Sequence, residues 1–402
     1  MDPLHFLPAW PPDATPLGWV AVLLLAAIVA GESVRRFLRI SRVIGYLAVG
    51  VLLGPAAGGV IDNGTAGHLR IFVDIAVGML LFELGQRVDL GWLRRNPSLL
   101  AASVLEATLT FMLVYVAMTW FGIRPVTAAA AALLAVATSP AVVMTVIKDL
   151  RAQGQVTERV MLFTALDTAY AVVGLTLIVG WLDYERERPL STMILHPLYL
   201  VLGSLLLAGV LAMVMLSLLR LFGRRPAFQF SATASLVLLT VAAATMLKLS
   251  VPLALLLLGM FARLFDHERH FVSLKFGEAA MLFIVLLFAL AGASLEFGGW
   301  STAVPLALAF AGARLLGKAV PILLLSHASG LALRKSSLVS LGLMPMSALS
   351  LLMLHELMRQ SPSLASEIGP PVFLAIAVLA FAGPLALEFA LRRAGEAAEE
   401  TR

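Results

Sequence analysis

Four charged residues stand inside long apolar segments of the sequence: Glu106, Asp167, Arg314 and Lys318. A charge near the centre of a bilayer costs at least about 2.5–3.5 kcal/mol, so each of these residues is expected to have an oppositely charged partner or a functional role. Arg314 and Lys318 are spaced i, i+4 and therefore project from one face of a helix. Counted at about 1.5 Å per residue from the segment ends, Asp167, Glu106 and Lys318 lie within roughly 4–6 Å of the midplane, and Arg314 lies close to the midplane itself.

These residue types permit a carboxylate to bind a proton and a metal cation in alternation. We expect Asp167 to be that carboxylate and Lys318 to neutralise it when the cation is absent. Glu106 is a second candidate ligand, and we expect its charge to be paired with Arg314. The alternative for each pair is a permanent ion pair that only holds helices together.

Two prolines fall near the centres of apolar segments, in Thr138-Ser139-Pro140 and in Met344-Pro345-Met346. A proline inside a helix removes one backbone hydrogen bond and clashes with the preceding turn. Each could be an ordinary kink, which membrane helices tolerate. Paired interruptions at the midplane are instead typical of transporter sites, where freed carbonyl groups face an ion. The Thr138 and Ser139 hydroxyls are then expected to add oxygen ligands.

The composition places these residues in a membrane protein. The chain has 402 residues, of which 60% are hydrophobic and 13% charged, and its mean hydropathy is +0.95. Segments such as residues 253–258 are apolar on every face, which predicts an α-helical bundle and not a β-barrel. The net charge of +5 does not indicate nucleic-acid binding, because the basic residues stand singly or in small groups at helix ends. No cysteine is present, so disulfides and thiolate metal sites are excluded.

Apolar runs bounded by charges, Gly or Pro predict thirteen membrane-spanning helices. Most Lys and Arg residues fall in loops on one side, which predicts an outer N-terminus and a cytoplasmic C-terminus in a bacterial-type inner membrane. Residues 1–16 lack the features of a signal peptide and are expected in the mature protein. The predicted spans are 18–37, 43–57, 68–88, 98–121, 127–148, 157–182, 192–222, 229–248, 251–265, 276–296, 302–326, 334–357 and 370–392.

The two halves of the chain are weakly similar in sequence. Gly50 in span two corresponds to Gly259 in span nine, and Pro140 in span five corresponds to Pro345 in span twelve. Equivalent spans are seven apart, and because seven is odd they must cross the membrane in opposite directions. Spans one to six and eight to thirteen are therefore predicted to form an inverted repeat, with span seven as the connector.

Four stretches resemble the monovalent cation:proton antiporters, the family of NapA-type sodium/proton exchangers and KefC-type potassium efflux systems. The helix before Gly54-Pro55 is similar to its Gly-Tyr-Leu signature, and Thr138-Ser139-Pro140 lies where the family has an unwound helix. The other matching segments are Asp74 to Asp89, Leu162 to Asp167 with its transport aspartate, and Gly317-Lys318 on the facing helix. Leu166 departs from the polar residue that the family has before the aspartate, and residues 344–347 replace a Gly-Gly-Glu-Phe-like segment of the KefC branch.

The resemblance implies an elevator-type homodimer in the lipid bilayer that exchanges Na⁺ or K⁺ for H⁺ and needs no cofactor. It implies dimerisation and scaffold helices in residues 1–90 and 229–296, ion-translocating core helices in 91–182 and 300–395, and a connector at 190–223. No regulatory domain is expected after span thirteen.

Two alternatives remain from other classes of transport protein. One is a sodium-coupled organic solute carrier of related fold, and the other is a gated cation channel. The absence of a second acid beside Asp167 favours electroneutral one-for-one exchange, provided that Glu106 is paired with Arg314.

Overall fold

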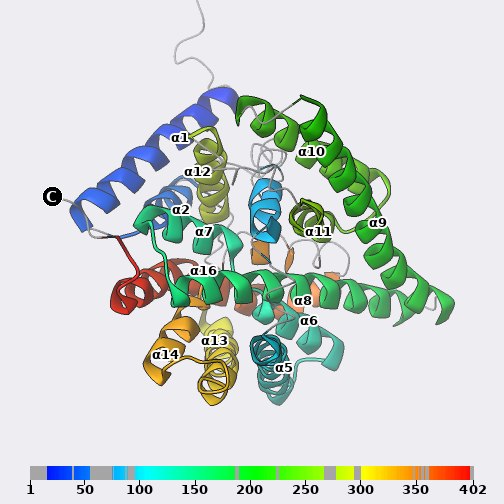
Figure 1. Ribbon diagram of the computed structural model, residues 1–402. Coiled ribbons are helices and arrows are strands. Elements are labelled where there is room, and N and C mark those ends of the chain that lie inside the picture. The colour runs from blue at the N-terminus through cyan, green and yellow to red at the C-terminus, as the bar shows by residue number, and fades with distance from the viewer. Residues whose placement is uncertain are drawn as a thin grey trace, which may run out of the picture.

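The protein is a bundle of α-helices in the computed structural model (Figure 1). The structure describes residues 16–38, 40–54, 75, 77–86, 88, 96–185, 190–222, 226–266, 278–293, 300–346, 349–351, 353–354, 357 and 362–398. Pro55, Asp74, Asp89 and Ser347, which belong to the motifs above, lie outside the described residues.

Helical residues occupy all thirteen predicted spans within the described part of the chain. Several helices begin with proline in the first turn, where its missing N–H costs nothing and its fixed φ favours the helix. The elements are α1 (Pro16–Ser33), the π-helical turn Val34–Leu38, α2 (Arg42–Leu53), the helix Val77–Gln86, α5 (Pro97–Trp120), α6 (Pro125–Val136), α7 (Pro140–Leu150), α8 (Gln155–Glu185), α9 (Leu190–Phe222), α10 (Pro226–Met246), α11 (Val251–Phe265), α12 (Glu278–Ala293), α13 (Trp300–Leu324), α14 (Leu333–Gly342) and α16 (Pro362–Ala394).

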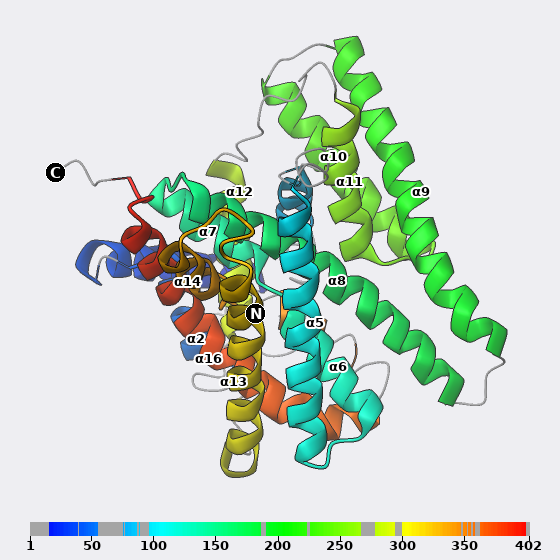
Figure 2. The ribbon, with the colours of Figure 1, turned by 60° about the horizontal axis from the view of Figure 1, so that its bottom comes forward.

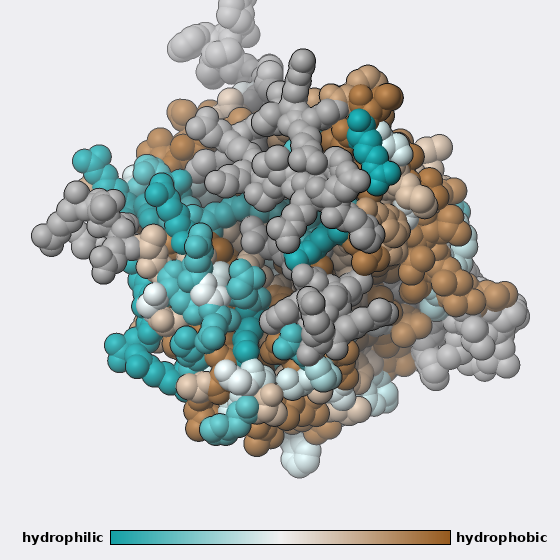
Figure 3. All heavy atoms as spheres, viewed as in Figure 1, coloured by the Kyte–Doolittle hydropathy of each residue, from teal (hydrophilic) through white to brown (hydrophobic). Residues whose placement is uncertain are grey.

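The lengths and compositions of these helices fit a chain that crosses a bilayer many times. Seven of the described helical segments, one of them formed by α6 and α7 together, are long and apolar enough to cross a membrane, and four shorter apolar helices accompany them. On the face seen in Figure 3, hydrophilic side chains gather over α7 and α14, whereas apolar side chains cover the edge that α9 and α10 form. The chain is therefore a multi-pass membrane protein, as its composition predicted.

The helices pack in distinct groups. One group contains α5 to α8, α13, α14 and α16, in which α5 and α13 lie side by side along most of their lengths (Figure 2). A second group contains α1, α2 and α12, and a third contains α9, α10 and α11. In Figure 1 the second and third groups lie on the side of α8 opposite to α5 and α13.

Two helix crossings at glycine pairs support the inverted repeat. A Cβ at Gly50 in α2 would lie 1.9 Å from the Ala289 carbonyl oxygen of α12, and one at Gly292 in α12 would lie 3.1 Å from the Gly50 Cα. A Cβ at Gly85 in the helix Val77–Gln86 would likewise lie 3.1 Å from the Gly259 Cα of α11. The α2 helix (span two) thus crosses α12 (span ten) in the same way as α11 (span nine) crosses the helix Val77–Gln86 (span three). In both crossings, glycine allows the two backbones to touch.

Both proline-containing spans are broken, as predicted. Span five consists of α6 and α7, separated by the extended residues 137–139, and span twelve leaves its helix after Gly342 and passes through Pro345. The Ser139 amide donates a hydrogen bond to the Pro345 carbonyl oxygen at 2.9 Å, so the two breaks cross at one place. In span twelve the described helical residues resume at 349.

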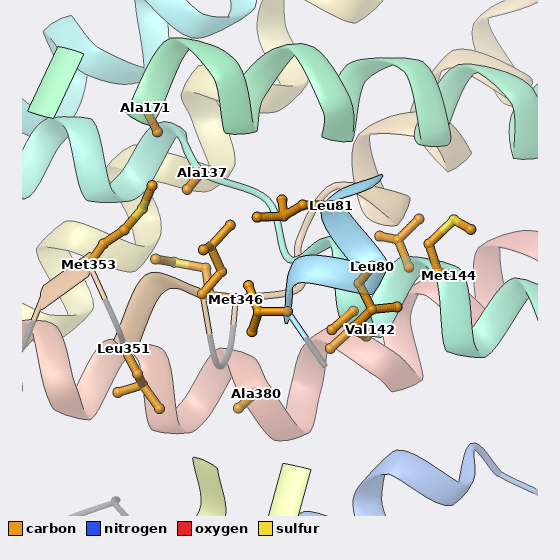
Figure 4. Packing of buried hydrophobic residues seen from close by; sticks show 14 of the residues in the cluster. Leu80, Leu81, Ala137, Val142, Met144, Ala171, Met346, Leu351, Met353 and Ala380 are labelled. Atoms are coloured by element: carbon orange, nitrogen blue, oxygen red, sulfur yellow. The ribbon is translucent and has the colours of Figure 1, made fainter. Parts of the chain in front are cut away.

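Apolar side chains fill the space around this crossing. Met346 of the second break belongs to the same buried cluster as Val142 and Met144 of α7. Leu80 and Leu81 from the helix Val77–Gln86 approach them from the neighbouring element (Figure 4). The crossing is therefore enclosed on this side by packed apolar residues.

Candidate functional site

A buried lysine joins two carboxylates beside the first helix break. Lys318 Nζ of α13 donates to Glu106 Oε1 of α5 at 2.7 Å and to Asp167 Oδ2 of α8 at 2.7 Å. Its third bond goes to the carbonyl oxygen of Val136, the last residue of α6, at 2.9 Å. An ammonium has three N–H donors, so all of them are used. The negative end of the α6 helix dipole favours a cation at this carbonyl.

The sequence around Lys318 allows α13 to come close to α5. A Cβ at Gly317 would lie 2.4 Å from the Thr110 Cα of α5, so a larger residue would push the two helices apart. Thr110 Oγ1 in turn donates to Glu106 Oε1 at 3.1 Å, one helical turn away. Close packing at Gly317 therefore brings Lys318 within hydrogen-bond distance of Glu106.

The residues of the first break reach the same carboxylates. Thr138 Oγ1 donates to Asp167 Oδ2 at 2.8 Å, and Thr168 Oγ1 of α8 lies 3.5 Å from the Thr138 carbonyl oxygen. The Ser139 side chain instead accepts from the Val142 amide at 3.4 Å and caps the start of α7 at Pro140. Thr138 thus contacts Asp167 directly, whereas Ser139 begins the helix that follows.

The expected pairing of Glu106 with Arg314 is wrong. Arg314 is fully buried, and its guanidinium donates to four carbonyl oxygens at 2.9–3.1 Å. Two of these oxygens belong to the end of α6 and two to the residues that follow α14: Ala135, Ala137, Leu343 and Met344. The physical reason is that each broken helix leaves carbonyl groups without amide partners, and a guanidinium has enough donors for both ends.

The positive charge of Arg314 is therefore compensated by backbone carbonyl groups and not by an acidic side chain. Each helix C-terminus is equivalent to roughly half a negative charge, so two of them balance about one positive charge. Lys318 is left as the cation in contact with the carboxylates. Of the sequence-predicted residues, the structure brings Asp167, Glu106, Lys318 and Thr138 into one hydrogen-bonded cluster, and it places Arg314 and Pro345 at the crossing beside it.

One oxygen of each carboxylate has no hydrogen-bond partner within the described residues. These atoms are Asp167 Oδ1 and Glu106 Oε2, and both residues are 0% exposed. A buried acceptor without a partner is costly, so it marks a position where a proton or a cation would be stabilised. The arrangement therefore offers two such oxygens from different helices.

Sequence reasoning missed two members of this site. Thr110 stands i+4 from Glu106, and that spacing on one helix could have identified it. The Val136 carbonyl could have been anticipated only in part, because Pro140 predicts free carbonyls in the preceding turn but not which cation they bind.

Comparisons with known proteins agree with this architecture. Residues 20–393 match the family model described as sodium/hydrogen exchanger, transmembrane. Two solved structures of the sodium proton antiporter MjNhaP1 from Methanocaldococcus jannaschii have similar folds at 14% identity. One has a TM-score of 0.67 and covers 94% of this chain and 95% of the other, and the second has a TM-score of 0.73 and covers 96% and 99%.

A curated relative matches over a shorter stretch. It is the iron transporter MagA of Paramagnetospirillum magneticum, which is 35% identical over 74 residues, or 18% of this chain. The match spans 16% of that relative's own length.

Proposed function

Because the chain belongs to the sodium/hydrogen exchanger family of transmembrane proteins, we propose that it exchanges Na⁺ or K⁺ for H⁺ across a membrane. The observation that carries the proposal is the buried Lys318 ammonium, which Asp167 and Glu106 share. The family expected from the sequence motifs is confirmed, and the cation and the residues that bind it are the proposed part.

The charges of the cluster explain why a proton and a cation would compete. Asp167 and Glu106 carry two negative charges when both are ionised, and Lys318 compensates one of them. The remaining charge sits in a buried site, where it must be neutralised by one proton or by one monovalent cation. Binding of either excludes the other, so the arrangement supports electroneutral one-for-one exchange.

The oxygens available to a cation come from three elements. We assign Asp167 and Glu106 as the anionic ligands and Thr138 as a neutral ligand, because these side chains meet at the break. The Ser139 hydroxyl, which accepts from the Val142 amide at 3.4 Å, is a further oxygen of the proposed set. A dehydrated Na⁺ or K⁺ prefers oxygen ligands of this kind.

Alternating access would move the core helices against the scaffold helices. The core helices are those of residues 91–182 and 300–395, the scaffold helices those of 1–90 and 229–296, and residues 190–223 connect them. Support comes from the dense packing within the group of α5 to α8, α13, α14 and α16. We propose an elevator motion of this group in a homodimer, with the N-terminus outside and the C-terminus in the cytoplasm.

Iron transport is a weaker candidate for this chain. The likeness to the iron transporter covers a short stretch, and the cluster offers carboxylate, hydroxyl and carbonyl oxygens with one ammonium. Softer nitrogen and sulfur ligands suit transition metals better than this set does. Within the described residues, no group of three or more His, Cys, Asp or Glu side chains could hold a metal ion.

The test is transport in liposomes that contain a pH-sensitive dye. We expect Na⁺ or K⁺ to collapse an imposed pH gradient with the wild type, and Asp167→Asn to abolish this while folding and assembly persist. A membrane-potential dye should report no potential during exchange. Cation flux without proton movement would favour a channel, sodium-driven solute uptake would favour a carrier, and exchange retained by Asp167→Asn would exclude Asp167 as the binding group.

A further inference from the structure

An ion pair outside the cation site joins a scaffold helix to a core helix. Lys148 Nζ, in the last turn of α7, lies 2.6 Å from Glu83 Oε2 of the helix Val77–Gln86. The Glu83 side chain is only 8% exposed, whereas that of Lys148 is 37% exposed. Close by along the chain, Arg35 Nη2 of the turn Val34–Leu38 donates to the Asp149 carbonyl oxygen at 3.1 Å. The end of α7 is therefore held by polar contacts from two scaffold elements.

The helix that bears Lys148 begins at the cation site. The α7 helix starts at Pro140, directly after Thr138, and Lys148 follows ten residues after Thr138. At about 1.5 Å per residue, the ion pair and the site lie at opposite ends of a rod roughly 15 Å long. A displacement of α7 that accompanies transport must therefore displace Lys148 as well.

The other contacts between α7 and the helix Val77–Gln86 are apolar and less directional than the ion pair. Leu80 and Leu81 pack with Val142 and Met144 of α7 through apolar contacts (Figure 4), which have no preferred direction and allow sliding. The contact between Glu83 and Lys148 is instead a charge-assisted hydrogen bond of 2.6 Å. Moving Lys148 beyond the reach of its flexible side chain would take a charge partner from a buried carboxylate.

We propose that Glu83 and Lys148 form a latch that holds the core helices in the present position and must open in every transport cycle. The inference rests on the proposed exchange and adds to it the contact that limits the conformational step. Opening the latch separates the two charges, so the pair raises the barrier for leaving this conformation.

Cysteine cross-linking tests the latch directly, because the native chain contains no cysteine. The variant Glu83→Cys/Lys148→Cys is reconstituted, treated with a short bifunctional thiosulfonate, and assayed for Na⁺- or K⁺-driven proton movement. We expect cross-linking to stop exchange and a reducing agent to restore it. The matched control is Gln86→Cys/Arg263→Cys, which joins two scaffold helices where Arg263 Nη1 already donates to the Gln86 carbonyl oxygen at 2.8 Å. Cross-linking of this pair should leave exchange unchanged.

A double-mutant cycle measures the coupling without a cross-link. Glu83→Gln and Lys148→Gln should each raise the maximal exchange rate by about three- to tenfold, because either change lowers the barrier that the pair imposes, and the ion KM should stay unchanged. The double variant should match the single variants, because either change opens the same bond. Additive effects, or exchange that survives cross-linking of residues 83 and 148, would overturn the latch while leaving the proposed exchange intact. A wild type that moves no protons with Na⁺ or K⁺ would instead overturn the exchange, and the latch with it.

Discussion

The Ser139 amide donates to the Pro345 carbonyl oxygen at 2.9 Å, which joins the two broken spans at the point where each proline interrupts its helix. This bond connects one residue from each half of the inverted repeat. The amide stands at the start of α7 and the carbonyl group follows α14. The first break therefore provides the hydrogen-bond donor and the second break provides the acceptor, and both groups are satisfied. The crossing is thus a single structural unit, to which Arg314 adds four further bonds.

Arg314→Lys is expected to destabilise this unit. A lysine has three donors in place of five and cannot form the four bonds to Ala135, Ala137, Leu343 and Met344. The loss should be about 2–4 kcal/mol, because buried carbonyls are left without donors. Thermal unfolding in detergent should show a lower Tm for Arg314→Lys, whereas Arg334→Lys at an exposed position should not change it. An equal Tm for Arg314→Lys and the wild type would contradict the role assigned to Arg314.

Much of this architecture could be predicted from the sequence because membrane helices obey strong local rules. Apolar length located the spans, and Pro140 and Pro345 located both breaks, since proline acts on the backbone of its own turn. The partner of Glu106 could not be predicted in the same way. Arg314 and Lys318 project from one face of α13, and which of them reaches Glu106 depends on how α13 packs against α5.

Two further contacts lay beyond sequence reasoning. Glu83 and Lys148 are 65 residues apart, and nothing in either helix indicates that they meet. Glu396 and Thr157 are 239 residues apart and are joined only by the packing of the chain. Long-range pairs of this kind follow from tertiary structure, and a short sequence pattern does not encode them.

Charge balance in the cluster gives a prediction about Glu106 and Lys318. Glu106→Gln leaves Asp167 neutralised by Lys318, so no charge remains for a proton or a cation to balance. Exchange should then be lost. The double variant Glu106→Gln/Lys318→Gln restores one uncompensated carboxylate and should regain measurable exchange in liposomes. Lys318→Gln alone leaves two uncompensated carboxylates, one of which should then keep its proton throughout the cycle. Transport should therefore slow or shift its pH profile while exchange stays one-for-one. If the double variant is as inactive as Glu106→Gln under every gradient, charge balance does not explain exchange.

The hydroxyl of Thr138 gives a prediction about ion affinity. Thr138→Val keeps the shape of the side chain but removes the bond to Asp167 Oδ2 and one proposed oxygen ligand. A hydrogen bond to a charged group contributes about 1.5–3 kcal/mol, so the ion KM should rise about tenfold or more, with a smaller effect on the maximal rate. Thr138→Ala/Ser139→Ala should raise it further. Thr240→Val, which removes an equally buried hydroxyl in α10, should leave the ion KM unchanged. Equal KM values for Thr138→Val and the wild type would leave Thr138 as part of the helix break only.

The last prediction concerns Glu396, whose carboxylate caps the helix that carries Asp167. Glu396 accepts from the amides of Val156 and Thr157 at 2.9 and 2.8 Å and from Thr157 Oγ1 at 2.8 Å, all in the first turn of α8. A Cβ at Gly154 would lie 2.2 Å from the Glu396 Cδ, so glycine leaves room for a capping group from the other end of the chain.

Glu396→Ala removes both the cap and a negative charge at the positive end of the α8 dipole, and it should lower stability by about 1–2 kcal/mol. Glu396→Gln keeps one acceptor oxygen and should lose less. The ion KM should stay at the wild-type value in both, because the cap lies about twelve residues from Asp167, or roughly 18 Å along the helix. The measurement is the Tm in detergent together with exchange in liposomes. Glu158→Ala, at an exposed position in the first turn of α8, is the control for the loss of charge alone. A Tm for Glu396→Ala equal to that of Glu158→Ala would show that the three bonds to α8 do not stabilise the folded protein.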